Sequence, residues 1–157
     1  MPDGDLELVG RAEELGRIRA LLGGVVAGRG RCALVLGEAG IGKTALAEAV
    51  ARDATGRGID VHWGRCADAE SPPYRPWVQL WDGLPGAAGR PLLEGGRHAS
   101  RAELFASVVE TLAAATRGRP AVLVIEDAHW ADESSLELLR FAISARGHRA
   151  GTRSTAR

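Results

Sequence analysis

The chain has 157 residues, the length of a single domain that can bury a hydrophobic core. Its formal net charge is zero and 45% of its residues are hydrophobic, so the bulk composition does not indicate a surface that binds polyanions. No apolar run is long enough to span a bilayer, and the acidic residues after Met1 do not match a secretory signal. We therefore expect a cytoplasmic protein that contacts neither a membrane nor nucleic acid directly.

The first predicted element is a helix from about Ala12 to Leu22. Its apolar residues, Leu15, Ile18 and Leu22, recur at spacings that place them on one helix face. A short loop, Val9-Gly10-Arg11, precedes the helix. On the residues alone, this loop is either functional or an ordinary glycine turn in front of a covering helix.

An apolar run at 32–36 predicts a strand, in which Cys32 would be a small buried core residue. Neither Cys32 nor Cys66 has a partner at metal-site or redox spacing. The helix that follows is predicted to reach about Ala54, with a glycine of the 55–58 turn in the left-handed position after it.

Between this strand and this helix lies Gly37-Glu38-Ala39-Gly40-Ile41-Gly42-Lys43-Thr44, which fits G-x-x-x-x-G-K-[ST] at every fixed position. Glycines let successive backbone N–H groups point at phosphate oxygens, and the helix N-terminus adds partial positive charge. Lys43 can reach the β- and γ-phosphates, and the Thr44 hydroxyl can bind Mg²⁺. Lys43 is also the only lysine among 20 basic side chains, which argues against a merely solvated charge. The alternative is a glycine-rich turn without a ligand.

Residues 59–66 predict a second strand, on which His62 has no second ligand at metal-site spacing. Prolines make 68–76 a loop, and a short helix follows at 78–81. The aromatic residues of this region either pack against the domain or form a partner surface. The glycine- and proline-rich stretch 83–96 predicts another loop.

Ser100 and Glu103 have the spacing of a capping box and predict a helix that ends near Thr116. The apolar run 121–125 then predicts a central strand buried on both faces of a parallel sheet. It ends in Glu126 and Asp127, which need a positive partner if they are buried.

An Mg²⁺ ion between Thr44 and Glu126 would be such a partner, and Asp127 would then orient a water for attack on a γ-phosphate. A solvated strand end is the alternative. Asp132 is placed to cap a last helix from Ser134 to about Ala145. The basic stretch 146–157 has no periodicity, and we expect a disordered tail that is either solvated or in contact with nucleic acid.

Three segments together resemble a known family: Leu8 to Leu15, Gly37 to Thr44, and Val124 to Asp132 with its His-Trp-Ala-Asp sequence. They are similar to the AAA+-related (STAND) signal-transduction ATPase module at the N-terminus of large bacterial LuxR-type transcriptional regulators. The same module occurs beside some adenylate cyclase and kinase domains. The resemblance covers about residues 6–145.

The resemblance implies an α/β P-loop NTPase fold, a three-layer sandwich with a parallel sheet, in which the second strand is an edge strand beside 121–125. It implies ATP and Mg²⁺ as cofactors, with Val9 to Arg11 on the adenine and ribose side. The catalytic candidates are Lys43, Glu126 and Asp127, and the metal candidates are Thr44 and Glu126. The nucleotide-binding candidates are Val9, Gly10, Arg11, Gly37, Glu38, Ala39, Gly40, Ile41, Gly42, Lys43, Thr44 and Ala45.

The sequence departs from this family in two ways. The acidic pair is Glu126 then Asp127, where AAA+ proteins commonly have Asp then Glu, and this order suits slow hydrolysis with nucleotide acting as a switch. The apolar sensor-1 strand, the lid and any helix-turn-helix are missing. We therefore expect a truncated chain with a partial ATPase domain at 1–145 and a tail at 146–157, whose protein partners or homo-oligomer contacts would come through missing domains.

Three functions remain open on the sequence. The first is an ATP-binding switch module with slow or no hydrolysis. The second is a non-enzymatic fragment with weak or no nucleotide binding, which the missing sensor-1 strand favours. The third is a DNA-binding regulator in its full-length form, although no recognition helix is visible in this chain.

Overall fold

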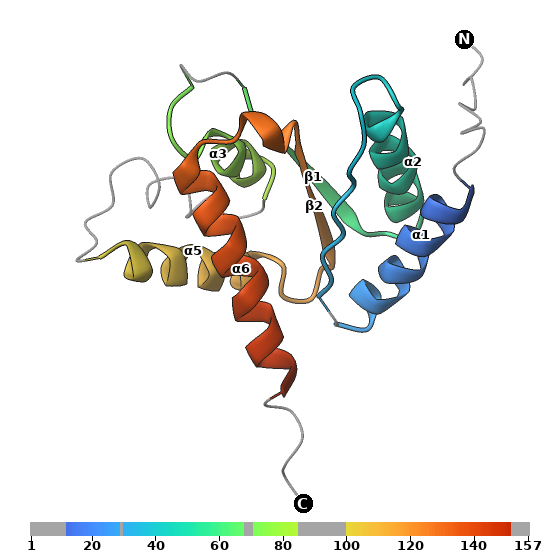
Figure 1. Ribbon diagram of the computed structural model, residues 1–157. Coiled ribbons are helices and arrows are strands. Elements are labelled where there is room, and N and C mark those ends of the chain that lie inside the picture. Colours follow the sequence, from blue (N-terminus) through green and yellow to red (C-terminus); the bar gives the residue numbers. More distant parts are fainter. Residues whose placement is uncertain (1–11, 29, 68–70, 85–99, 152–157) are drawn as a thin grey trace, which may run out of the picture.

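The computed structural model describes residues 12–28, 30–67, 71–84 and 100–151, with side chains up to Ala145. These residues form three layers, with a two-stranded sheet as the middle layer (Figure 1). The elements are α1 (Ala12–Val26), α2 (Lys43–Gly56), β1 (Asp60–Arg65), α3 (Arg75–Asp82), α5 (Arg101–Ala115), β2 (Ala121–Glu126), the 3₁₀ turn η1 (Ala128–Trp130) and α6 (Glu133–Gly151). Helices α1 and α2 cover one face of the sheet, and α3, α5 and α6 cover the other.

The two strands are parallel, and their register runs from Asp60 opposite Ala121 to Arg65 opposite Glu126. Because side chains alternate along a strand, Val122 packs on the α1–α2 side while Leu123 packs on the α3–α5–α6 side. This pairing confirms the expected neighbours. The observed architecture is that of an incomplete α/β P-loop NTPase-like fold.

Each face of the sheet has its own apolar core. The α1–α2 core consists of Leu15, Leu22, Leu46, Ala49, Val50, Ala54 and Ile59. The α3–α5–α6 core consists of Trp77, Leu80, Trp81, Leu84, Phe105, Val108, Leu112, Leu138 and Ala142. Both tryptophans of α3 are therefore buried packing residues, which decides against a partner surface made by these two rings.

The predicted strand at 32–36 is wrong. The segment has no regular structure, the residues Leu34 and Leu36 are 75% and 78% exposed, and Cys32 is exposed rather than in the core. A strand exists only where a neighbour accepts its backbone hydrogen bonds, and within the described residues β2 pairs with β1 alone. For the same reason β2 is half-buried along its whole length, not buried on both faces.

The helices agree better with the sequence. Helices α1, α2 and α5 lie where the apolar spacing predicts them, and Gly58 adopts the left-handed φ of 71° after α2. Helix α3 already begins at Arg75, and α6 continues to Gly151, beyond its predicted end. Most of the predicted 83–96 loop and the last residues of the tail, 152–157, lie outside the described residues. Within the described part of the chain, no helix has the length and apolar content to cross a membrane.

Candidate functional site

The glycine-rich loop turns directly into α2. Gly40 and Gly42 have φ angles of 77° and 89°, in the left-handed region where a side chain is strained. Gly42 is the N-cap of α2, and its carbonyl accepts the first helical hydrogen bond, from Leu46 N at 3.0 Å. The loop therefore ends at a helix N-terminus, where unpaired N–H groups and the helix dipole attract anions.

The single lysine lies across this loop. Lys43 is the first residue of α2, and its Nζ donates hydrogen bonds to the carbonyl oxygens of Gly37 at 2.9 Å and Glu38 at 2.8 Å. Both ends of the loop are thereby joined through one ammonium group. Thr44, the next residue, is exposed on the first turn of the helix.

The acidic pair lies at the carboxyl end of β2, as predicted. Glu126 is the last residue of the strand, and its side chain is only 10% exposed. Asp127 follows in the left-handed region, with φ 54° and ψ 38°, and its side chain is 48% exposed. An aspartate tolerates this backbone conformation better than most residues. The turn at Asp127 thus separates a shielded carboxylate from a solvated one.

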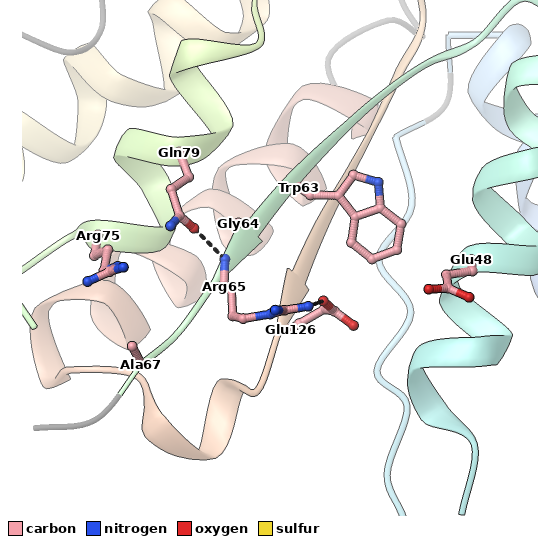
Figure 2. Close-up of a pocket in the computed structure, with 8 residues that line it drawn as sticks. All are labelled: Glu48, Trp63, Gly64, Arg65, Ala67, Arg75, Gln79 and Glu126. Carbon is pink, nitrogen blue, oxygen red and sulfur yellow. Dashed lines mark hydrogen bonds and ion pairs between the residues drawn. The ribbon is translucent and has the colours of Figure 1, made fainter.

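The positive partner of the acidic pair in this structure is Arg65, which the sequence reasoning missed. Arg65 ends β1 directly opposite Glu126, and its Nη2 lies 2.7 Å from Glu126 Oε2 (Figure 2). Its Nε is 4.0 Å from Asp127 Oδ2. The hydrogen bond to Glu126, and then the charge of that carboxylate, raise the pKa of the Arg65 guanidinium.

Helix α3 holds the backbone of Arg65. The side-chain oxygen of Gln79 accepts a hydrogen bond from Arg65 N at 2.7 Å. Helix α3 can approach this closely because Gly64 has no side chain: a Cβ there would lie 2.3 Å from the carbonyl oxygen of Pro76. The register of the sheet and the packing of α3 together fix the backbone position of Arg65, from which its side chain extends.

A cavity of about 460 Å³ connects the acidic edge with α2. Glu48 from α2 and Trp63 from β1 point into the same space as Arg65 and Glu126, as Figure 2 shows. Glu48 lies one turn after Thr44, so the two residues share a helix face. The face of α2 that carries Thr44 is therefore turned toward Glu126, although Thr44 itself does not line the cavity.

The predicted site is only partly described. Gly37 to Ala45 form the loop and the start of α2, and Glu126 and Asp127 follow the sheet edge. Val9, Gly10 and Arg11 lie outside the described residues. Arg65 and Gln79 were not predicted as site residues. The predicted strand ending at Cys66 and the acidic pair were already clues that Arg65 shares an edge with Glu126.

A second cavity, of about 320 Å³, lies beside the His-Trp-Ala-Asp segment. It is lined by Cys66 and Asp132 among others, and the rings of His129 and Trp130 are 5.2 Å apart at its rim. Cys66 is buried, and burial, followed by the charges of Asp132 and Asp127, raises the pKa of its thiol. The thiol in this cavity is thus shifted away from its nucleophilic thiolate form, which gives no support to a nucleophilic or redox role.

The loop, the start of α2 and the acidic edge beside the first cavity offer groups that fit a nucleotide and its metal ion. The loop and the α2 N-terminus offer N–H donors and a lysine to phosphates, and Thr44 and Glu126 offer the oxygen ligands that Mg²⁺ prefers. The described residues contain no group of three or more His, Cys, Asp or Glu side chains that could hold a metal ion alone. Mg²⁺ binds proteins through few carboxylates together with substrate phosphates, so this sparse set is appropriate.

Comparison with known proteins supports the same assignment. Residues 7–151 match the family described as the AAA ATPase domain, and this match includes the loop, the acidic pair and Val9 to Arg11. No curated protein and no solved structure matches the chain. The match implies a nucleotide-binding P-loop module, and usually Mg²⁺ with it. Because the match spans most of its length, the chain belongs to the AAA ATPase domain family.

Proposed function

We propose that this chain is the Mg-ATP-binding switch module of a signal-responsive regulator, with slow or no hydrolysis. The observation that carries the proposal is the loop that ends at the N-terminus of α2, with Lys43 bonded across it. The face of α2 beyond this N-terminus is turned toward the carboxylate of Glu126. In this proposal, phosphates bind at the loop and a cation binds at the carboxylate.

The chain's own residues have distinct roles in this proposal. Lys43 exchanges its two carbonyl partners for phosphate oxygens, and Thr44 and Glu126 hold Mg²⁺. Bound Mg²⁺ neutralises phosphate charge. Val9 to Arg11 take the adenine and ribose side, as the resemblance to LuxR-type regulators implies. Asp127 orients water, and its short, exposed side chain suits slow turnover and hence a switch.

The test is thermal unfolding with and without Mg-ATP. Saturation at 100 times Kd stabilises a protein by about 2.7 kcal/mol, and for a chain of this size each kcal/mol raises Tm by roughly 2–4 °C. We expect this increase for the unmodified chain and its loss in Lys43→Ala. Arg57→Ala is the matched control, because Arg57 is an exposed basic residue at the opposite end of α2. An equal increase in Lys43→Ala and the unmodified chain would contradict the proposal.

Release of inorganic phosphate from ATP measures the second part of the proposal, which is slow or no hydrolysis. We expect turnover well below the roughly 1–10³ s⁻¹ of typical enzymes, and we expect Asp127→Ala to abolish what remains. A fragment that binds nucleotide weakly or not at all is the competing function, and the unpaired segment at 32–36 is the observation that favours it. Steady ATP hydrolysis that is lost in both Lys43→Ala and Asp127→Ala would exclude that alternative.

A further inference from the structure

Arg65 and Mg²⁺ need the same carboxylate. The guanidinium donates from Nη2 to Oε2 of Glu126, the residue that the proposed function assigns to the metal. The Glu126 side chain is 10% exposed, and a shielded carboxylate requires a positive partner. Arg65 fulfils this requirement in the structure, so a metal ion arriving at Glu126 meets a site whose charge is already compensated.

The two cations repel each other at short range. A guanidinium 2.7 Å from the carboxylate would lie close to a divalent ion on that carboxylate, and like charges at such distances repel. Arg65 can withdraw, because its side chain is 64% exposed and can extend into solvent. Its backbone stays in place through the hydrogen bond to Gln79. The side chain can therefore exchange between the carboxylate and water without moving the strand.

We propose that Arg65 is a positioning residue that holds Glu126 and competes with Mg²⁺ for it, and so sets the Mg²⁺ concentration at which the site takes up nucleotide with its metal. This inference rests on the proposed function for the identity of the site. It goes beyond that function because Arg65 here opposes metal binding. In this proposal, nucleotide without metal does not use the Glu126 carboxylate, so the competition for that carboxylate concerns only the state that contains the metal.

The chain contains a matched control for this proposal. Arg119 forms an ion pair with Asp60 at the opposite end of the same strand, with Nη2 3.1 Å from Oδ1. Its side chain is 68% exposed, close to the value for Arg65. Arg65→Gln and Arg119→Gln remove the same charge and break the same kind of pair, but only the first variant changes the acidic edge.

The experiment measures binding of a fluorescent ATP analogue in EDTA and then at increasing Mg²⁺. We expect Arg65→Gln to lower the half-saturating Mg²⁺ concentration roughly fivefold to tenfold, the size of one nearby charge in a solvated site. The affinity of Arg65→Gln for the analogue in EDTA should equal that of the unmodified chain. In Arg119→Gln, both this affinity and the half-saturating Mg²⁺ concentration should equal those of the unmodified chain. Arg65→Lys keeps the charge but loses the guanidinium geometry, so its half-saturating Mg²⁺ concentration should lie between those of the unmodified chain and Arg65→Gln. Equal Mg²⁺ dependence in the unmodified chain, Arg65→Gln and Arg65→Lys would overturn the proposal, as would a higher Mg²⁺ requirement in Arg65→Gln.

A metal-only measurement separates this proposal from the proposed function. Binding of Mn²⁺ to the protein without nucleotide, followed by the paramagnetic resonance of free Mn²⁺, should be tighter in Arg65→Gln than in the unmodified chain. If the analogue binds no variant but Mn²⁺ shows this difference, the proposed function fails and the competition stands. If the analogue binds but Arg65→Gln changes neither its Mg²⁺ dependence nor the binding of Mn²⁺, the competition fails and the function stands. If neither probe binds any variant, both are overturned.

Discussion

At the scale of single residues, the two cysteines show how strongly the environment decides the reactivity of a side chain. Cys32 is exposed in the segment before the loop, whereas Cys66 follows β1 and is only 3% exposed. Burial is the first cause that raises the pKa of the Cys66 thiol, and the charges of Asp132 and Asp127 add to it. The reactive thiolate of Cys66 is therefore disfavoured, and reagents in solvent have little access to the side chain.

We expect iodoacetamide at pH 8 to label Cys32 at least about tenfold faster than Cys66, because thiolate fraction and access both limit the reaction. Mass spectrometry of the two cysteine peptides over time gives both rates from one sample. Labelling in denaturant is the control, since unfolding removes the burial that protects Cys66. Comparable rates in the native protein would show that the second cavity is open at Cys66.

Candidate site residues that belong to a local pattern could be found in the sequence. Lys43 and Thr44 belong to one motif, and Glu126 and Asp127 end one apolar run, so both groups are visible without a fold. The predicted strand ends indicated only that Arg65 shares a sheet edge with Glu126; that the two residues lie directly opposite each other depends on the register of the two strands. The intervening chain is long, and no local spacing encodes that register.

At the scale of elements, Asp132 connects two helices. Its Oδ1 accepts from Ser135 N at 2.9 Å, and its Oδ2 accepts from Ser135 Oγ at 2.6 Å, which caps α6 as predicted. The same Oδ2 accepts from Tyr74 N at 3.3 Å, just before α3. Tyr74 has a left-handed φ of 64°, a strained conformation for an aromatic residue, and this contact holds the strained turn.

Asp132→Ala should lower the free energy of unfolding by about 1–2 kcal/mol, the upper range for loss of an N-cap, because α3 loses a contact together with α6. Chemical denaturation followed by circular dichroism measures this change. Glu133→Ala is the control, since Glu133 is exposed, stands next in the chain and lies in the first turn of α6. A denaturation midpoint for Asp132→Ala equal to that of Glu133→Ala would contradict a capping role.

The elements that could be predicted are those that local spacing determines. Apolar residues three and four apart indicated α1, α2 and α5, and Ser100 accepts from Glu103 N as the capping box requires. The run at 32–36 has the composition of a strand just as 121–125 does. Only the second run has a partner in the described structure. Strand pairing depends on residues far apart in the chain, so composition alone could not distinguish the two.

At the scale of the whole molecule, two apolar cores share one narrow sheet. The α1–α2 core and the α3–α5–α6 core lie on opposite faces of β1 and β2, as Figure 1 shows. The segment at 30–36 leads from α1 to the loop outside this sheet, and Val35 alone among the residues 32–36 packs partly against the α1–α2 core. Local stability should therefore differ sharply between the paired strands and the segment that carries the loop.

Amide hydrogen exchange should show this difference directly. The amides of Asp60 and Cys66 donate hydrogen bonds of 3.1 and 3.0 Å at the two ends of the β1–β2 pair, whereas 32–36 pairs with no described strand. We expect the amides of residues 33–36 to exchange at least about 100-fold faster than those two, because exchange there needs no opening of the sheet.

Protein concentration is the control for this measurement. Leu34 and Leu36 are exposed apolar side chains on an unpaired extended segment, a combination that favours pairing between copies of a chain. Protection of 33–36 that appears only at high concentration, and is lost in a Leu36→Ser variant, would therefore report association between molecules. Protection that is independent of concentration would contradict the conclusion that this segment is unpaired. In that case the P-loop would be anchored within the sheet, and the competing assignment of a weakly binding fragment would lose the observation that favours it.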